Sequence, residues 1–392
     1  MQVVHAPAPL PEAVTATIFL AGPSPRGEGG GLHWRGEALE LLAQAGFTGH
    51  VFVPLPAPGQ SWPADYIDQA GWEQTALERA DVVLFWIPRE LERMPGFTTN
   101  VEFGQHCRGR NVVLGHPVDA PKCRFLDFLA ERNFIAVSHT LAEAVERAVA
   151  MVGEGAARRG GECQVPLYLW RTPSFAGWLA AQRSAGNRLD GCRVELSFGV
   201  GPRRGFLMFW AAHVDVHVAA EGRNKSNELV IGRPDIMHVV GLAPAPEGSW
   251  LDARVILVRE FRSPAATRDG FVHELPGGSS FTPGRDGRAL AALELEEETG
   301  VAIAAERFVA RGARQCMATL LTHRAELYSV ELTADEIAAF RARVGQRFGE
   351  NESERTYVEV RTVAEILAAD DVDWTHVGMI LSVLGPPPGS AA

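Results

Sequence analysis

The sequence predicts a two-domain α/β protein whose first domain is built on a parallel β-sheet. Three observations lead to this class. Apolar strand patterns alternate with amphipathic helix patterns from residue 17 to residue 152, which is typical of βαβ crossovers. The 392 residues, 46% of them apolar, are too many for one typical hydrophobic core. A glycine-rich run at 153–162 breaks the periodicity, so we expect domains at 1–155 and 163–388.

The elements of the first domain alternate in a regular order. Each short apolar run is followed by a longer stretch with a helical period. Ligands of such sheets bind beyond the carboxyl ends of the strands, so we expect a site in the loops that follow them. The expected strands lie at 15–22, 50–56, 81–88 and 111–117, and the expected helices lie at 31–46, 66–80, 100–110 and 141–152.

The second domain has a different pattern, because short strands dominate it. Only two convincing helical stretches occur, at about 287–299 and near the C-terminus, which indicates an α+β arrangement. The aromatic and basic stretch at 168–191 fits an element packed against the second domain or a dimer contact, and we expect a homo-oligomer. The expected strands include 192–200, 205–221, 227–232, 235–243, 253–262 and 323–332.

Composition argues against several classes of protein. The net charge of −11 argues against duplex nucleic acid as a partner, whereas small anionic ligands bound by local arginines remain compatible. No run approaches the ~20 apolar residues of a membrane helix, and the N-terminus lacks a signal-peptide pattern. We therefore expect a cytoplasmic protein without a membrane partner. Five scattered cysteines predict reduced, mostly buried thiols rather than a zinc site.

The stretch GRALAALELEEETG at 287–300 predicts a helix with an unusual acidic face. Asp286 is a suitable N-cap and Gly300 a suitable residue for the C-terminal stop. Glu294, Glu297 and Glu298 share one face, and their like charges repel each other. Oxygen ligands at this spacing suit a hard divalent cation such as Mg²⁺, which would relieve the repulsion. A charged surface helix is the simpler alternative.

The context of this helix favours the metal site. The string ELPGGSSFTPGRDGRALAALELEEETGV at 274–301 resembles the signature of Nudix hydrolases, and the flanks at 256–265 and 352–360 are similar to the branch that acts on nucleoside-diphosphate sugars. The resemblance implies a Nudix-type α/β/α sandwich that cleaves a phosphate bridge with Mg²⁺ or Mn²⁺. It also implies these site residues: Glu294, Glu297, Glu298 and the Gly277 carbonyl as metal ligands, Glu298 and Glu354 (or Glu352) in catalysis, and Arg262 in substrate binding.

The signature departs from the family in two places. The segment from Gly278 to Gly300 is one residue longer than the family spacing, with Arg285 or Asp286 where the first glutamate is expected. The second departure matters more. Leu293 stands where Nudix hydrolases have an arginine that pairs with the catalytic carboxylates. An arginine fork orients carboxylates, and leucine does not. The sequence therefore leaves open a second class of function, a nucleotide-binding sensor with one or both sites degenerate.

Three segments of the first domain carry a second resemblance. They are the strand and glycine-rich turn IFLAGPSPRGEGG at 18–30, the segment around Asp81, and GFTTNVEFG at 96–104, which contains Glu102. Together they are similar to the nucleoside 2-deoxyribosyltransferase family over roughly residues 17–150, which implies a flavodoxin/Rossmann-like sheet.

The resemblance to the deoxyribosyltransferases assigns roles to named residues. Glu102 would be the nucleophile that attacks C1′ of a nucleoside or nucleotide, and Asp81 would handle the proton of the departing base. The turn with Gly22, Pro23 and Arg26 would bind an anionic group of the substrate through backbone N–H groups and the guanidinium. Transfer to a second base and hydrolysis by water both remain open.

The two resemblances together predict an enzyme of nucleotide metabolism. A Nudix step on a nucleoside diphosphate derivative, such as an ADP-ribose-like compound, would release a nucleoside monophosphate. The first domain could then split that product into a base and a sugar phosphate. A small-molecule nucleotide or nucleoside is thus the expected substrate.

Overall fold

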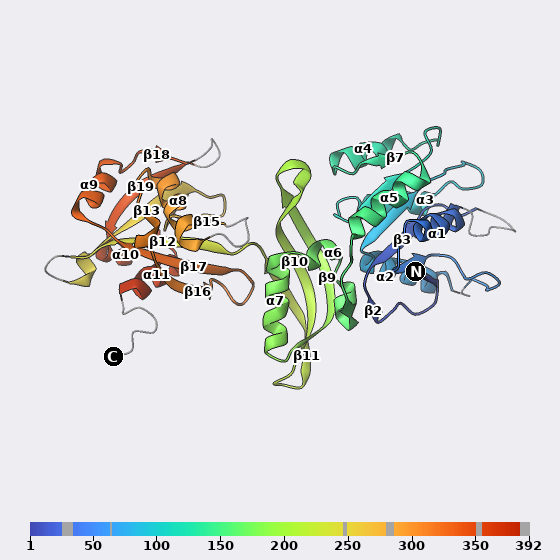
Figure 1. Ribbon diagram of the computed structural model, residues 1–392, viewed down its shortest axis with the longest axis horizontal. Coiled ribbons are helices and arrows are strands. Elements are labelled where there is room, and N and C mark those ends of the chain that lie inside the picture. The colour runs from blue at the N-terminus through green and yellow to red at the C-terminus, as the bar shows by residue number, and fades with distance from the viewer. Residues whose placement is uncertain (26–33, 63–64, 246–248, 280–285, 350–354, 385–392) are drawn as a thin grey trace. The chain divides into compact units, whose positions relative to one another are not determined.

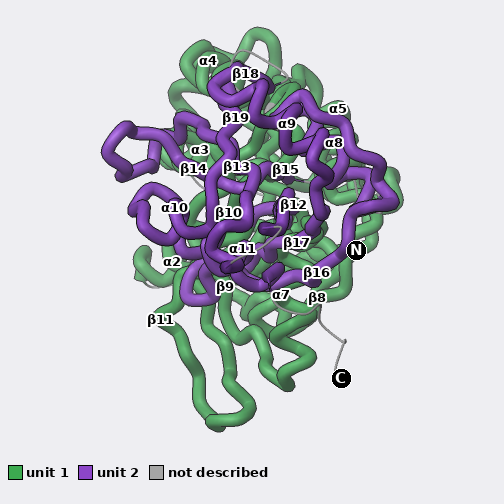
Figure 2. Tube along the Cα trace, turned by 90° about the vertical axis from the view of Figure 1, so that its left-hand side faces the viewer, with its two compact units in different colours: residues 1–232 green, residues 233–392 purple. Residues whose placement is uncertain are grey.

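The computed structural model describes residues 1–25, 34–62, 65–245, 249–279, 286–349 and 355–384. The chain divides into two compact units, unit 1 (Met1–Gly232) and unit 2 (Arg233–Ala392), which Figure 2 draws in green and purple. The division falls between residues 232 and 233, later than the glycine-rich run at which the sequence suggested a boundary.

Unit 1 contains the α/β arrangement with a parallel sheet that the sequence predicts (Figure 1). Its six strands run in the order β1-β4-β3-β5-β6-β7, and every neighbouring pair is parallel. The chain leaves β3 toward β4 and later returns to β5 on the other side, so the connections diverge between β3 and β5. The strands are β1 (Gln2–His5), β3 (Thr17–Ala21), β4 (His50–Val53), β5 (Val82–Trp86), β6 (Val112–Gly115) and β7 (Val137–Ser138).

Helices cover both faces of this sheet, which explains why its central strands β3, β5 and β6 are fully buried and mostly apolar. On one face α1 (Trp34–Gln44) and α5 (Leu141–Val152) pack against the strands in a single hydrophobic cluster. The apolar residues of these helices recur at helical spacing and bury one stripe. The other face is covered by α2 (Tyr66–Arg79), α3 (Phe97–His106) and α4 (Arg124–Arg132).

Unit 1 also contains the short antiparallel pair of β2 (Ala13–Val14) and β8 (Arg158–Arg159) and a three-stranded antiparallel sheet. This sheet has the order β11-β10-β9, and the aromatic stretch expected at a domain or dimer contact packs on it as α6 and α7. Ring centroids of Phe175 lie 5.4 Å from those of both Trp178 and Trp210, which fixes α7 against β10. The elements are α6 (Leu167–Trp170), α7 (Pro173–Ser184), β9 (Arg188–Val200), β10 (Phe206–Val218) and β11 (Arg223–Gly232).

Unit 2 is a mixed sheet with helices on both faces. The main path of strands is β16-β17-β12-β13-β19-β18, with β14 paired to β13 and β15 paired to β12. Helices α8 and α9 share one hydrophobic cluster with the sheet, and α10 and α11 share the other. The strands are β12 (Ile236–Ala243), β13 (Arg254–Phe261), β14 (Phe271–Glu274), β15 (Gly277–Ser279), β16 (Val309–Gln315), β17 (Arg324–Glu331), β18 (Arg347–Phe348) and β19 (Thr356–Thr362). The helices are α8 (Gly287–Thr299), α9 (Ala334–Ala342), α10 (Val363–Ala368) and α11 (Trp374–Leu384).

The acidic helix α8 forms as its end signals predict. The Asp286 side chain accepts a hydrogen bond from the Arg288 N–H at 3.1 Å, and Gly300 adopts the left-handed conformation with φ of 67°. Ala291 and Leu295 are fully buried on the sheet side. This orientation leaves the glutamates along the remaining faces of the helix.

The structure also bears on the predictions about membrane-spanning helices and about cysteine thiols. Of the helices in the described ranges, none is both long and apolar enough to cross a bilayer. All five cysteines are free thiols, and four of them are buried.

Candidate functional site

A cavity in unit 1 lies at the carboxyl edge of the parallel sheet, where the chain connections of β3 and β5 diverge. Its volume is 540 Å³, within the range of small-molecule sites. Glu102 on α3 lines it together with Gly22 and Pro23, as the sequence predicts for a site at strand ends. The full lining is Phe19, Ala21, Gly22, Pro23, Ser24, Arg35, Pro54, Trp62, Tyr66, Gln69, Glu73, Pro95, Gly96, Phe97, Thr98, Thr99 and Glu102.

Two glycines let the backbone reach this geometry. A Cβ on Gly22 would lie 2.2 Å from the Trp86 carbonyl oxygen, so only glycine allows the end of β3 to approach β5 this closely. Gly96 has a φ of 64° and turns the chain into α3. Glu102, one and a half turns into that helix, then lies on its buried face with 7% of its surface exposed.

The surroundings of Glu102 favour its neutral form. Burial raises the pKa of the Glu102 carboxyl to about 7, repulsion from Glu73 adds to the shift, and attraction to Arg35 opposes it. Burial likewise raises the pKa of Glu73, against a hydrogen bond from Gln69. Two carboxyls whose ionisation is coupled in one cavity are suited to acid and base chemistry near neutral pH.

Arg35 ties the glycine-rich turn to the core. It donates from Nε to the Leu20 carbonyl oxygen at 3.1 Å and from its two terminal nitrogens to the Gly22 carbonyl at 2.6 Å and the Ser24 hydroxyl at 3.0 Å. Its guanidinium carbon lies 4.5 Å from the ring centroid of Trp34. Burial lowers the pKa of Arg35 to about 10, so the group stays charged and supplies a fixed positive field near Glu102.

Gln69 on α2 presents an acceptor that is not used within the described protein. Its Nε2 donates to the Pro54 carbonyl at 3.2 Å and to Glu73 Oε1 at 2.7 Å, which orients the amide. The other atom of the amide, Oε1, is buried and has no hydrogen-bond partner among the described residues. Gln69 as a whole is 4% exposed, so water does not easily take the place of that partner. A buried acceptor of this kind favours a ligand that donates a hydrogen bond.

Asp81 does not meet Glu102, which corrects the expectation that the two share a reaction. Asp81 precedes β5 at the amino edge of the sheet, whereas Glu102 lies at the carboxyl edge. Its fully buried carboxylate binds Arg158 through two ionic hydrogen bonds of 2.7 and 2.6 Å. Thr17 and the Leu167 N–H donate to the same oxygens at 2.8 to 3.0 Å. With every lone pair engaged and no solvent access, Asp81 has a structural role.

Several residues that line the cavity were not predicted from the sequence. Tyr66, Gln69 and Glu73 occupy positions i, i+3 and i+7 of α2, so all three fall on one helix face that points into the cavity. These three residues could have been identified from the sequence, because they form a polar stripe at helical spacing on a helix that packs against an apolar sheet. Trp62 also lines the cavity, and the predicted Arg26 lies outside the described residues.

In unit 2 the end of α8 meets the β14–β15 turn. Glu298 Oε2 accepts a hydrogen bond from the Gly277 N–H at 3.0 Å, while the role of the Gly277 carbonyl as a metal ligand stays a prediction. Burial raises the pKa of Glu298 well above its usual range, and repulsion from Glu274, Glu294 and Glu260 adds to the shift. These carboxylates are therefore near one another.

Glycine and arginine accommodate this acidic cluster. A Cβ on Gly278 would lie 2.4 Å from a carboxylate oxygen of Glu294, so the side chain rests directly on the backbone. Arg262, predicted as a substrate ligand, forms ion pairs with Glu260 at 2.7 Å and with Glu274 at 3.2 Å, and its role toward a substrate stays a prediction. Arg262, which directly follows β13, thus supplies positive charge to the cluster from outside the signature at 274–301.

The described residues do not establish the predicted magnesium site. Within the described ranges, no three His, Cys, Asp or Glu side chains are placed so that they could hold a metal ion. Glu297 is partly buried on α8, and Leu293 is 40% exposed. Glu352 and Glu354 lie outside the described residues. The magnesium site therefore stays a prediction.

Comparison with known proteins adds no assignment: no protein-family model matches the chain, and no curated protein is significantly similar to it.

Proposed function

We propose that unit 1 cleaves the N-glycosidic bond of a nucleoside or nucleotide. The observation that carries the proposal is the placement of Glu102 beside a second carboxyl, Glu73, in a cavity at the carboxyl edge of a parallel sheet. The strand order around β3 corresponds to the flavodoxin-like arrangement, whose ligands bind at this edge.

The reaction uses the two carboxyls in different states. The Glu102 carboxylate attacks C1′ of the sugar, the bond from C1′ to the base nitrogen breaks, and a glycosyl ester forms on Glu102. The Glu73 carboxyl gives its proton to the departing base nitrogen. A water molecule then attacks C1′ while Glu73 takes back a proton, which frees the sugar and the Glu102 carboxylate. Glu73 thus replaces Asp81 as the acid.

The remaining groups of the cavity support binding of such a substrate. Gln69 Oε1 accepts a hydrogen bond from a hydroxyl or amino group of the substrate. Trp62, Tyr66 and Phe97 line the cavity and are 57%, 70% and 68% exposed, which leaves their rings accessible to a flat base.

The test is release of a free base from a panel of nucleosides and nucleotides, measured by chromatography. We expect Glu102→Gln to abolish release and Glu73→Gln to reduce it by about 10²–10⁴-fold, the usual contribution of a general acid. Asp68→Asn, at an exposed acid of the same helix α2, is the matched control and should keep full activity. Full activity of Glu102→Gln would refute the proposal, and exchange with an added second base would identify a transferase.

As a second function we propose that unit 2 hydrolyses a phosphate bridge with Mg²⁺ or Mn²⁺ as cofactor. The contacts of Glu298 with the Gly277 N–H and of Glu294 with Gly278 favour it, because they hold two carboxylates of the signature at one turn. In this scheme the nucleoside monophosphate from unit 2 becomes the substrate of unit 1.

The two functions are separated by point variants. Mass spectrometry of an ADP-ribose-like substrate with Mg²⁺ should show bridge cleavage that Glu298→Gln removes and Glu296→Gln, at the exposed neighbour, retains. Release of the base should follow only when Glu102 is intact. Tight nucleotide binding without any product would favour the sensor.

A further inference from the structure

A second cavity in unit 1 lies at the amino edge of the parallel sheet, away from Glu102. It is formed by the start of β6, the loop before β7, the end of α5 and the hairpin between β9 and β10. Its volume of 530 Å³ suits a small molecule. The lining residues are Arg108, Gly109, Arg110, Val112, Val113, Asn133, Phe134, Ile135, Ala136, Arg147, Ala150, Met151, Ser197, Phe198, Gly199 and Arg203.

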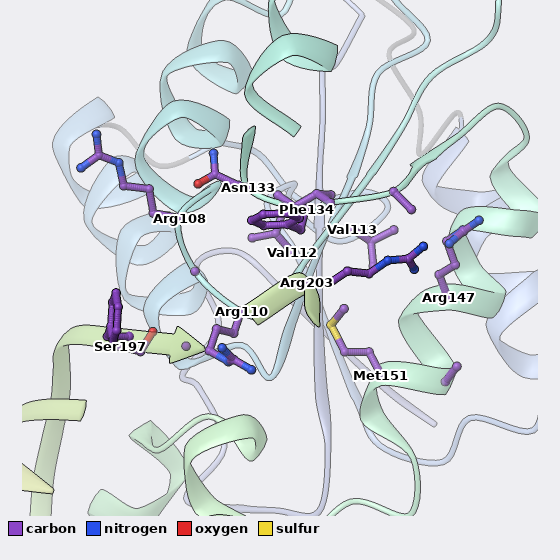
Figure 3. A pocket seen from close by; sticks show the side chains of 16 residues that line it. Arg108, Arg110, Val112, Val113, Asn133, Phe134, Arg147, Met151, Ser197 and Arg203 are labelled. Atoms are coloured by element: carbon purple, nitrogen blue, oxygen red, sulfur yellow. The ribbon is translucent and has the colours of Figure 1, made fainter. Parts of the chain in front are cut away.

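The charged side chains that line this cavity are all positive. It contains four arginines and no aspartate or glutamate, in a chain whose net charge is −11. Arg147 has an ion pair of 2.8 Å with Glu143 on its own helix, but both side chains are over 40% exposed and such pairs contribute little. Figure 3 shows the labelled arginines around the ring of Phe134. The cavity therefore attracts an anion with several charges.

One arginine also holds the walls of the cavity together. The Arg110 guanidinium donates to the Gly205 carbonyl oxygen at 2.8 Å, which joins the segment before β6 to the β9–β10 hairpin. Arginine, with its planar fork of donors, is the side chain best matched to phosphate oxygens.

Exposed aromatic rings also line this cavity, beside the arginines. Phe134 and Phe198 line it from two different segments and are 53% and 51% exposed. Asn133 and Ser197, which precede them, add polar groups beside the rings. Exposed rings next to arginines are typical of sites that stack a nucleobase while binding its phosphates.

Backbone conformation marks the same place. Among the described residues, three that are not glycine have a positive φ, and two of them, Phe134 at 60° and Arg203 at 52°, line this cavity. A left-handed conformation at a bulky residue costs free energy and is concentrated at functional sites. Here it directs an aromatic ring and a guanidinium into one cavity.

We propose that this cavity binds a nucleoside polyphosphate at a site separate from the Glu102 cavity. The arginines bind the phosphates, and Phe134 stacks on the base. The site does not depend on the proposed glycosidic activity, because it shares no lining residue with the Glu102 cavity.

Calorimetric titration of the full chain in EDTA, with ADP and with pyrophosphate, tests the proposal. Arg108→Glu and Arg203→Glu change exposed side chains, and together they should weaken the binding of both probes at least tenfold. Arg124→Glu, an exposed arginine of α4 outside the lining, is the control and should leave both affinities unchanged. Phe134→Ala should weaken ADP but not pyrophosphate, and Phe125→Ala on α4 should weaken neither.

Two results would overturn the proposal. ADP affinity that falls in Gln69→Ala but not in the double arginine variant would place the nucleotide in the Glu102 cavity, which would leave the proposed function intact. Equal weakening by Arg124→Glu would show attraction by general charge rather than by this cavity. Circular dichroism of each variant checks that the fold is retained.

Discussion

Glu102 links the ionisation of one side chain to the stability of unit 1. Its pKa is raised from 4.5 to about 7 in the folded protein, so folding favours the protonated form. Below pH 4.5 the carboxyl is protonated in both the folded and the unfolded chain and carries no penalty. Between pH 4.5 and about 7 the carboxyl ionises in the unfolded chain but not in the folded one, so the folded state loses up to about 3 kcal/mol relative to a neutral side chain, and above pH 7 the loss stays constant.

Glu102→Gln should therefore stabilise unit 1 at pH 8 and lose that advantage as the pH falls to 5. Urea unfolding at both pH values measures the difference. Parallel pH profiles for the two proteins would show that the carboxyl is not held in its neutral form. In the proposed reaction the attacking Glu102 carboxylate forms as the pH rises through 7 while Glu73 must keep its proton, so we expect the base-release activity to pass through a maximum rather than to rise steadily with pH.

Asp81 is expected to affect stability and not chemistry. Asp81→Ala leaves the Arg158 guanidinium buried without its partner, which should destabilise unit 1 by about 3–5 kcal/mol. Asp81→Asn keeps one acceptor oxygen, but its NH₂ group would face only donors and the guanidinium charge would stay unneutralised, so it should also destabilise unit 1. Urea unfolding gives the loss, and activity per folded molecule should stay near that of the parent. Selective loss of activity with unchanged stability would restore Asp81 as a catalytic residue.

At the scale of elements, the contact between β3 and β5 depends on Gly22. In Gly22→Ala the new Cβ would meet the Trp86 carbonyl at 2.2 Å, so the end of β3 must move and the turn that Arg35 holds must move with it. We expect at least a tenfold loss of base release. Gly71→Ala on α2 makes the same chemical change where no atom lies within 4 Å, and it should be stabilising by ~1 kcal/mol with full activity.

The elements also show which parts of the structure the sequence predicts. Helix α8 could be located because Asp286 and Gly300 act within one turn of its ends. Four of the six parallel strands, β3, β4, β5 and β6, could be located because their residues are mostly apolar, whereas β1 and β7 were not predicted because they are short and contain polar residues. The sequence did not predict that β9, β10 and β11 belong to unit 1, because this depends on contacts between residues remote in sequence, such as Phe175 with Trp210. For the same reason Glu73, 29 residues before Glu102, was missed as its partner.

At the scale of the whole molecule, each unit has its own hydrophobic clusters. Calorimetry should therefore resolve two unfolding transitions, which a single two-state transition would contradict. Asp81→Ala should lower the midpoint of one transition. Gly300→Ala should lower the other, because Gly300 has a φ of 67° and a Cβ there would lie 2.3 Å from the Phe348 ring. A shift of both transitions by either variant would show that the units unfold together.

The ion pair of Asp81 with Arg158 has a practical consequence for anyone who divides the chain. The glycine-rich run at 153–162 invites a cut at residue 155, but a fragment 1–155 would keep the buried acid and lose the base that neutralises it. We expect that fragment to aggregate on expression, whereas a fragment 1–232 should be soluble and monodisperse by gel filtration. Arg158 lies in a stretch that has the composition of a linker, but it belongs to the parallel-sheet domain because it neutralises the buried Asp81.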